Sequence, residues 1–283
     1  MRTGETVALQ DETGLSSADK SQGYILTCAR AALSDVELDI QDLGDVTLVT
    51  PRTLPCRISA LDQVARDVLR VKLRVPPGSG FTYTPGQYID VIGPGGLRRS
   101  YSIANAPASH QQLELHIRRV DGGAMSDYWF GAAKLDDLLR LHGPLGTFFL
   151  RDVLDVNLIF LATGTGIAPV KAMLEGLKAE APAPRSVAVY WGGRVPGDVY
   201  WDPSEIGNAQ RFVPVLSRAD TTWSGARGHV QDVLLLEETD WGRTSVYACG
   251  SDPMIQDARL KLVAAGLVER RFFSDAFVCS AAA

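Results

Sequence analysis

The sequence of 283 residues predicts an antiparallel β-barrel followed by an α/β doubly wound parallel sheet. Between residues 56 and 150, short strands with one apolar and one polar face are separated by turn residues, which is typical of a barrel. From residue 156 onward, apolar strands alternate with helical segments, which predicts a parallel sheet covered on both faces. A glycine-rich turn at 164–169 marks the first strand-to-helix connection of that second part.

Composition and charge exclude several classes of protein. Hydrophobic residues make up 46% of the chain and charged residues 22%, and the formal net charge is −5. No block of five basic residues occurs, so we expect no nucleic-acid partner. The longest strongly apolar run, Leu158–Ala162, is too short for a membrane span, and the first residues lack the apolar core of a secretory signal. We therefore expect a cytoplasmic protein without membrane contact.

Residues 1–50 form the first predicted domain, and they hold few apolar residues for a core of their own. A helix is expected at Ser16–Gly23, capped by Ser16 or Ser17. Two short strands are expected at Tyr24–Cys28 and Val36–Ile40. Residues 50–55 are interpreted as a linker, because two prolines in six residues argue against a regular element.

Residues 51–152 form the predicted barrel domain. In the strand that begins at Leu69, the apolar side chains alternate with basic ones, a period of two with one wet face. Further strands are expected at Tyr88–Ile92 and Leu113–Val120, the latter with Leu113, Leu115 and Ile117 facing inward. One helix is expected at Ser126–Ala133.

Residues 153–283 form the predicted parallel-sheet domain. Leu158–Ala162 is apolar throughout, as expected of a strand buried on both faces. The further expected strands are Ser186–Trp191, Phe212–Ser217, Ser245–Cys249 and Arg270–Phe273. The expected helices are Ile167–Glu180, Val230–Glu237 and Pro253–Ala265.

The turn Gly164–Pro169 follows a buried strand and begins a helix. Glycines at such a turn let backbone amides approach a diphosphate, and the free N–H groups of the helix point at it. Each charged hydrogen bond of this kind contributes about 1.5–3 kcal/mol. Pro169 stands where the dinucleotide fingerprint has a third glycine. The alternative is a plain strand-to-helix turn.

Arg98–Ser102 combines the side chains that a flat, phosphorylated cofactor needs. An arginine can grip a diphosphate, and the ring of Tyr101 can stack on a heterocycle. The hydroxyl of Ser102 can donate to a ring nitrogen. Gly122–Ser126 is a second place where helix amides could meet a phosphate. The alternatives are an exposed basic strand end and an ordinary serine-capped loop.

Cys249 and Gly250 lie at the carboxyl end of a predicted strand, the edge where ligands of open α/β sheets bind. A small thiol and a glycine leave room there for a flat ring; a cysteine packed in the core is the alternative. Phe277 could cover such a ring or belong to the core. The four cysteines (Cys28, Cys56, Cys249 and Cys279) have no C-x-x-C spacing and the histidines are scattered, so we expect reduced thiols and no metal site.

Together, these motifs and their order resemble the ferredoxin–NADP reductase superfamily over residues 55–278. The resemblance implies that Arg99 holds the flavin phosphates, Tyr101 stacks on the ring, Ser102 bonds near N5, and Gly123–Ser126 binds a diphosphate, which favours FAD over FMN. It implies that Gly164–Pro169 binds NAD(P)H, with Cys249 and Gly250 beside the nicotinamide and Phe277 shielding the flavin. The expected cofactor-binding residues are Arg99, Ser100, Tyr101, Ser102, His116, Ile117, Arg118, Gly123, Ala124, Met125, Ser126, Gly164, Thr165, Gly166, Ile167, Pro169, Arg194, Ser217, Arg218, Cys249, Gly250 and Phe277.

The amino-terminal segment has a resemblance of its own. Gly23–Cys28 and Leu33–Leu38 look like the last part of a plant-type [2Fe–2S] ferredoxin domain, here a partial β-grasp remnant. Such a domain needs C-x4-C-x2-C ahead of its final cysteine, and only the final one, Cys28, is present. One thiolate cannot hold two irons, so no [2Fe–2S] cluster is expected in this chain. The domain order resembles the CDP-6-deoxyglucoseen reductases of dideoxysugar synthesis and the reductase components of ring-hydroxylating oxygenases.

The leading hypothesis is an FAD-dependent NAD(P)H oxidoreductase in electron transport, with Ser102, Cys249 and Phe277 as catalytic residues. It would pass hydride from NAD(P)H to FAD and then single electrons to an acceptor protein, which is an oxygenase, a dehydrase or a ferredoxin. Arg194 and the pair Ser217-Arg218 slightly favour NADPH, although relatives with this pair accept NADH. The alternative is a non-catalytic flavin- or nucleotide-binding module left by a degenerate reductase.

Overall fold

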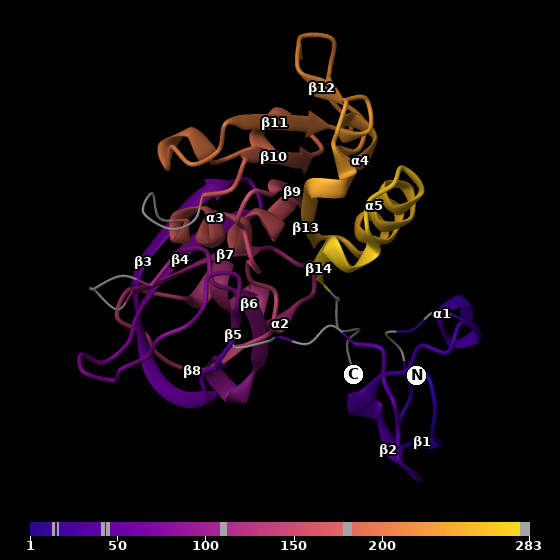
Figure 1. Cartoon of the computed structure of the whole chain (residues 1–283). Helices are drawn as coiled ribbons and strands as arrows, with labels where there is room; N and C mark the ends of the chain where they lie inside the picture. Colours follow the sequence, from indigo (N-terminus) through magenta and orange to yellow (C-terminus); the bar gives the residue numbers. More distant parts are fainter. Residues whose placement is uncertain are drawn as a thin grey trace. The chain divides into compact units, whose positions relative to one another are not determined.

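The computed structural model describes residues 1–277 except 13, 14, 16, 41, 42, 44, 45, 108–111 and 178–182. It divides into two units, residues 1–48 and residues 49–283 (Figure 1). The predicted barrel and the predicted parallel sheet both fall within the second unit. The boundary predicted between them at residue 152 therefore stays a prediction. Cys279 lies outside the described residues.

The first unit contains one small antiparallel pair, β1 (Thr6–Ala8) with β2 (Arg30–Ala32), and the short helix α1 (Ser17–Ser21). The strands predicted at 24–28 and 36–40 are wrong. The backbone N–H of Leu26 donates to the Glu12 carboxylate at 3.0 Å instead of to a neighbouring strand. In the segment 36–40 only Glu37 forms a bridge, to Thr3. The predicted helix is shorter than expected, and its cap candidate Ser16 is outside the described residues.

The barrel of the second unit is built from antiparallel strands in the order β6-β5-β8-β3-β4-β7. A bridge between Ile103 and Leu115 joins the end of β6 to β7. Leu113, Leu115 and Ile117 are buried in the core, as the alternation predicts. The strands are β3 (Arg52–Ala65), β4 (Val68–Arg74), β5 (Tyr88–Ile92), β6 (Arg98–Ser102), β7 (Gln112–Arg118) and β8 (Leu138–Leu145).

The linker predicted at 50–55 is wrong, because β3 begins at Arg52 and runs through Pro55. Residues 52–56 pair only with β8, and pairing with β4 starts at Arg57. One side of β3 is therefore open at Pro55, and a residue without an N–H is tolerated at such an edge. The helix predicted at 126–133 begins earlier, as α2 (Ala124–Asp127), and continues as a π-helical turn to Ala132.

The second sheet is parallel, with the strand order β12-β11-β10-β9-β13-β14, as the sequence predicts. The chain starts at the central strand β9, and the strand order reverses between β9 and β13. In doubly wound sheets this switch point is where ligands bind. The strands are β9 (Asn157–Thr163), β10 (Ser186–Gly193), β11 (Arg211–Leu216), β12 (Ala226–Arg227), β13 (Thr244–Gly250) and β14 (Phe272–Ala276).

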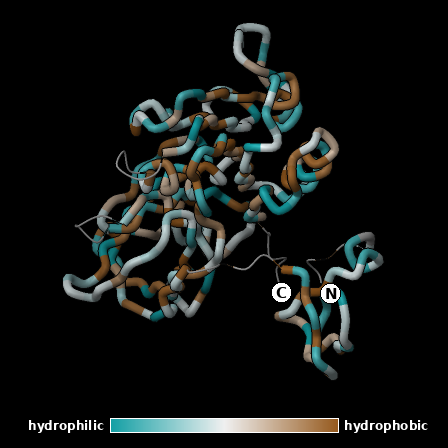
Figure 2. Tube along the Cα trace, viewed as in Figure 1, coloured by the Kyte–Doolittle hydropathy of each residue, from teal (hydrophilic) through white to brown (hydrophobic). Residues whose placement is uncertain are grey.

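Among the described residues, three α-helices accompany this sheet: α3 (Ile167–Gly176), α4 (Val230–Leu234) and α5 (Asp252–Ala264). Helix α5 has hydrophobic and hydrophilic residues along its length (Figure 2), and it buries Met254, Ile255, Ala258 and Leu262 against the sheet. Helix α3 is mostly buried, which is expected of a helix that packs on more than one layer. In the described part of the chain, no helix combines the length and the apolar character that a membrane crossing requires.

Candidate functional site

One face of β6 is committed to a carboxylate on the neighbouring strand. Asp90 of β5 pairs with Ser100 in the sheet register, and its side chain is buried. The guanidinium of Arg98 lies 2.6 Å from Asp90 Oδ2, and the Ser100 hydroxyl donates to Oδ1 at 2.5 Å. Asp90 was not foreseen from the sequence. Arg98 and Ser100 therefore help to fix the strand, and their side chains are directed to Asp90.

The other face of β6 carries Arg99 and Tyr101. Trp129 donates its indole N–H to the Tyr101 hydroxyl at 3.0 Å, and the two rings meet edge to face at 84°. Burial raises the pKa of Tyr101 to about 12, against the effects of the Trp129 hydrogen bond and the Arg99 charge. Arg99 is exposed, and among the described residues no carboxylate pairs with it. The ring of Tyr101 is thus held in one orientation beside a cation that is accessible to an anion.

The loop Gly123–Ser126 lies against the turn that precedes β6. A Cβ on Gly93 of that turn would stand 2.9 Å from the sulfur of Met125. The Ser126 hydroxyl accepts a hydrogen bond from the backbone N–H of Val120 at 2.9 Å, so this side chain closes its own loop. The first N–H groups of α2 have no partner within the helix. In this loop the backbone, more than the serine side chain, is placed to bind a phosphate.

The three residues predicted on β7 have different environments. Ile117 is buried in the barrel core, and the His116 ring is buried between Glu114 and Tyr200. Only Arg118 presents a partly exposed side chain, and its guanidinium bonds Asp67 at 3.1 Å. Side-chain contact with a cofactor is therefore open to Arg118 alone of the three.

The predicted dinucleotide turn joins β9 to α3 at the switch point of the sheet. Gly164 has a φ of 54°, in the left-handed region that favours glycine. A Cβ at Gly164 would stand 2.9 Å from the Arg118 guanidinium. The Trp191 indole N–H donates to the Gly164 carbonyl at 2.9 Å. Pro169 and Ile167 are buried in the first turn of α3. An arginine of the barrel thus lies directly against this turn.

The end of β13 touches the same turn. A Cβ at Gly166 would stand 2.2 Å from the carbonyl oxygen of Cys249, and a Cβ at Gly250 would stand 2.1 Å from the hydroxyl of Thr163. The backbone N–H of Ser251 donates to that hydroxyl at 3.1 Å. Only glycine permits this approach of the two loops. The structure therefore brings the predicted turn and the predicted Cys249-Gly250 pair into contact.

Asp275 of β14 stands opposite Cys249 in the sheet register. Cys249 is fully buried, and burial together with the Asp275 charge raises the pKa of its thiol, so the thiol stays protonated near neutral pH. Burial raises the pKa of Asp275 itself to about 6. After burial and Asp90, Asp275 also raises the pKa of Tyr88, which pairs with Ser102 on the barrel. The charge of Asp275 therefore acts both on Cys249 at the end of β13 and on Tyr88, the register partner of Ser102.

Asp275 was missed by the sequence analysis. The signal was present: an acidic residue two positions before Phe277, in a strand that borders Cys249. Phe277 follows β14, its backbone N–H donates to the Gly250 carbonyl at 2.9 Å, and its side chain is 38% exposed. Ser102 is nearly buried, and within the described residues its hydroxyl has no hydrogen-bond partner.

Arg194, Ser217 and Arg218 gather at the carboxyl ends of β10 and β11. The backbone N–H of Arg218 donates to the Arg194 carbonyl at 2.8 Å, and the Ser217 hydroxyl donates to the carbonyl of Gly193. The Arg194 side chain lies 3.2 Å from Asp67, a carboxylate that it shares with Arg118. Neither this carboxylate nor Asp198, which bonds the Arg194 backbone, was expected from the sequence.

The amino-terminal unit contains Cys28, the cysteine that the sequence compares with a cluster ligand. Cys28 is exposed. Throughout the described part of the chain, no group of three or more histidine, cysteine, aspartate or glutamate side chains could hold a metal ion.

Known proteins resemble this chain along most of its length. Residues 55–150 match the family model described as an oxidoreductase FAD-binding domain, and residues 160–260 match an oxidoreductase NAD-binding domain. The CDP-6-deoxy-L-threo-D-glycero-4-hexulose-3-dehydrase reductase of Yersinia pseudotuberculosis is 42% identical over 277 residues, which are 95% of this chain and 82% of that protein. The xylene/toluene monooxygenase electron transfer component of Pseudomonas putida is 32% identical over 274 residues, 93% of this chain and 76% of that one.

Solved structures agree with these relatives. A cytochrome P450 reductase of Amycolatopsis matches with a TM-score of 0.78 at 30% identity, covering 98% of this chain and 85% of its own. The ferredoxin reductase of a carbazole 1,9a-dioxygenase matches with a TM-score of 0.77 at 25% identity, covering 98% of this chain and 84% of its own.

Proposed function

The chain belongs to the family of oxidoreductases with an FAD-binding and an NAD-binding domain, and on this premise we propose that it passes electrons from NAD(P)H through FAD to a partner dehydrase. It is an NAD(P)H-dependent flavoprotein reductase of the ferredoxin–NADP reductase type. The observation that carries the proposal is that the turn at Gly164–Gly166 contacts both Arg118 of the barrel and the Cys249 end of β13.

The residues at the site fit the two coenzymes. Arg99 offers a guanidinium without a carboxylate partner among the described residues, as a diphosphate requires, and Ser102 offers a hydroxyl that is free for a ring nitrogen. Gly164 and Arg118 combine a left-handed glycine turn with a cation, which suits the pyrophosphate of a dinucleotide. A Cβ at Gly164 would stand 2.9 Å from the Arg118 guanidinium and would fill the space between them.

Bound NAD(P)H and FAD supply the redox chemistry, in which hydride moves between the two rings and electrons then leave singly to a protein acceptor. The side chains of the protein hold the two coenzyme rings in position. Tyr101, fixed by Trp129, gives a flat face for one ring, and Ser102 donates a hydrogen bond at its edge. Cys249 is fully buried, so in this proposal the second ring lies at the carboxyl end of β13 beside Gly250. The exposed Phe277 would cover the first ring until the second arrives.

The coenzyme is proposed to be NADPH. Arg194, Ser217 and Arg218 stand together at the strand ends where the adenosine ribose of a dinucleotide would lie. Arg218 is exposed, and in the part of the chain that the structure describes its side chain has no acidic partner. A guanidinium in that state suits a ribose phosphate.

The acceptor is proposed to be a dehydrase of the kind named for the 42% identical relative. An oxygenase component is the second candidate, supported by the 32% identical electron transfer component. Reduction of each class of acceptor by the purified chain and NAD(P)H decides between them. A higher rate with the oxygenase component would contradict the dehydrase assignment.

Anaerobic addition of NADPH or NADH to the purified, FAD-loaded chain tests the function itself. We expect the visible absorbance of the flavin to bleach. Tyr101→Ala is expected to lower FAD affinity, because it removes the half-buried ring that we propose to stack on the flavin. FAD binding without bleaching by either coenzyme would instead favour the non-catalytic binding module.

A further inference from the structure

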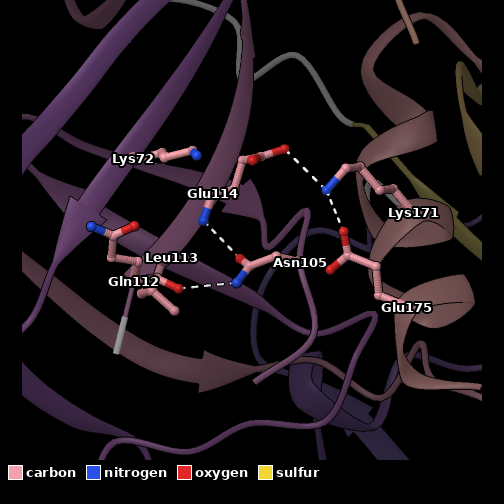
Figure 3. A pocket seen from close by; sticks show the side chains of 7 residues that line it. All are labelled: Lys72, Asn105, Gln112, Leu113, Glu114, Lys171 and Glu175. Carbon is pink, nitrogen blue, oxygen red and sulfur yellow. Dashed lines mark hydrogen bonds and ion pairs between the residues drawn. The ribbon is translucent and has the colours of Figure 1, made fainter. Parts of the chain in front are cut away.

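A polar cluster joins α3 to the segment that follows β6 (Figure 3). We name it the latch, and it consists of Glu114, Lys171 and Glu175. The ammonium of Lys171 lies 2.5 Å from Glu175 and 3.2 Å from Glu114, and it donates to the Ala104 carbonyl at 3.2 Å. Glu175 accepts a hydrogen bond from the backbone N–H of Ala106 at 2.8 Å. Two side chains of one helix thus hold both a carbonyl and an amide of the same short segment.

The segment that the latch holds, residues 104–106, directly follows β6, the strand proposed to bind the flavin. The backbone N–H of Ala104 donates to the Glu114 carbonyl at 2.7 Å, and the Asn105 side chain accepts from the Glu114 N–H at 2.7 Å. Residues 104–106 are therefore fixed to β7 on one side and to α3 on the other. Helix α3 in turn begins at the dinucleotide turn, and Lys171 lies about one helical turn beyond its first residue.

Two of the three latch side chains, Lys171 and Glu114, are largely buried, and the third, Glu175, is 29% exposed. The side chains of Lys171 and Glu114 are only 13% and 11% exposed, and they border a cavity of about 180 Å³ (Figure 3). Burial keeps His116 neutral by lowering its pKa, so the ring donates one N–H to Glu114 and accepts the Tyr200 hydroxyl at its other nitrogen. Hydrogen bonds in such a setting fix direction as well as distance, which an apolar contact would not.

We propose that Lys171 and Glu175 are positioning residues that set how closely the nicotinamide approaches the flavin. The inference rests on the proposed function. A displacement of α3 relative to residues 104–106 would move the Gly164–Gly166 turn relative to β6, and small misplacements of reacting groups cost large factors in rate. The residues of the latch touch neither coenzyme in this account, so removing them changes the approach of the rings rather than the binding of either one.

The test compares four variants in the FAD-loaded chain. Lys171→Met removes the charge and every donor, Lys171→Arg keeps both, and Glu175→Gln removes one charge. Lys261→Met is the control. Lys261 lies on α5, away from the latch, and it also bonds two carboxylates, Asp232 of α4 and Asp257 of α5. We measure the rate of anaerobic flavin reduction by NADPH, the affinities for FAD and NADP⁺ by calorimetry, and hydrogen exchange of the Ala106 amide without coenzymes.

Lys171→Met and Glu175→Gln should lower the reduction rate by about tenfold or more, leave both affinities nearly unchanged, and speed exchange at Ala106. Lys171→Arg should retain most of the rate, and Lys261→Met should match the parent chain. If Lys171→Met fails to fold, Glu175→Gln carries the comparison.

Reduction at the parent rate in both Lys171→Met and Glu175→Gln, or a loss of coenzyme affinity that accounts for the slower rate, would overturn the positioning role. If hydrogen exchange at the Ala106 amide is unchanged in Lys171→Met and Glu175→Gln, these side chains do not hold residues 104–106. If the parent chain binds both coenzymes but its flavin is not reduced, the proposed function is refuted instead. Hydrogen exchange at the Ala106 amide would then still show whether Lys171 and Glu175 hold residues 104–106.

Discussion

At the scale of residues, the side chains near the site divide into those that shape it and those left free for ligands. Arg98 and Ser100 belong to the first group, because both bond Asp90. Arg99, Tyr101 and Ser102 belong to the second. Sequence reasoning recognised the segment but could not separate the two groups. The separation depends on Asp90, which comes from another strand and whose pairing with Ser100 no local pattern reveals.

The same limit accounts for two further acidic residues, Asp275 and Asp67, that the sequence did not reveal. Each is an ordinary acidic residue in the sequence, and each gains its role from a neighbour far along the chain: Cys249 for Asp275, and Arg118 with Arg194 for Asp67. Glycines were easier to interpret, because a glycine-rich segment directly after an apolar strand predicts a tight turn from local sequence alone.

Arg218→Ala should raise the KM for NADPH by about tenfold, since a charged hydrogen bond of about 1.5 kcal/mol is lost. The KM for NADH should stay within about twofold, because that coenzyme lacks the phosphate. Steady-state kinetics with both coenzymes and a dye acceptor measure the ratio. Arg259→Ala is the control, because it removes an arginine of α5 that pairs with Glu269 away from the site. Equal losses with both coenzymes would mean that Arg218 does not select between them.

Asp275→Asn should stabilise the chain above pH 6. Burial raises the pKa of Asp275 to about 6 in the folded state, so the folded state binds more protons than the unfolded state between about pH 4 and 6. Stability supplied by this group is present at low pH and is lost as pH rises through that window. The loss is at most about 3 kcal/mol, and less because the side chain is partly exposed.

Urea unfolding of the Asp275→Asn variant and the parent chain at pH 4.5 and pH 8 measures this difference. We expect a clear gain at the higher pH and a smaller one at the lower. Asp121→Asn, on an exposed loop, is the control and should give no such pattern. If the variant and the parent chain differ in unfolding free energy by the same amount at both pH values, the raised pKa of Asp275 is contradicted.

At the scale of elements, the sequence pattern located the strands of the parallel sheet well and those of the barrel in part. A strand buried on both faces, such as β9, is apolar throughout, and this pattern is distinctive. In the barrel, β3 and β8 were not foreseen, because Pro55 in one strand and Gly143-Pro144 in the other have the composition of breakers. Whether a proline breaks a strand depends on which side of it is paired, and that is a tertiary fact.

Gly166→Ala should damage the junction of β9, α3 and β13. The backbone of Gly166 is helical, with φ at −59°, so alanine alone would favour the helix by about 1 kcal/mol. The new Cβ would stand 2.2 Å from the Cys249 carbonyl, and overpacking of this kind costs about 1–3 kcal/mol. We expect a net loss of stability and weaker NADP⁺ binding.

Thermal unfolding and calorimetry measure both effects of Gly166→Ala. Gly197→Ala is the matched control, because a Cβ there meets no described atom within 4 Å. It should be neutral or slightly stabilising. A Gly166→Ala variant as stable as Gly197→Ala would show that the two loops are not in close contact.

At the scale of the whole molecule, the order of the two sheets followed from the sequence, and the family resemblance agrees with the relatives found. The contact between the sheets could not be derived in the same way. It is made by a polar latch and by single pairs such as Arg194 with Asp67, which meet only after both sheets have formed. The extent of the predicted ferredoxin-like remnant, and the residues that bind each coenzyme, stay predictions.

The central claim is that the two coenzymes meet directly between β6 and the end of β13. NADPH carrying deuterium at the transferred position of the nicotinamide tests it in an anaerobic rapid-mixing experiment with the FAD-loaded chain. If the rings touch, the flavin bleaches and the deuterated coenzyme bleaches it more slowly. If both coenzymes bind and the flavin keeps its colour, or bleaches without any dependence on the isotope, direct transfer between adjacent rings is contradicted.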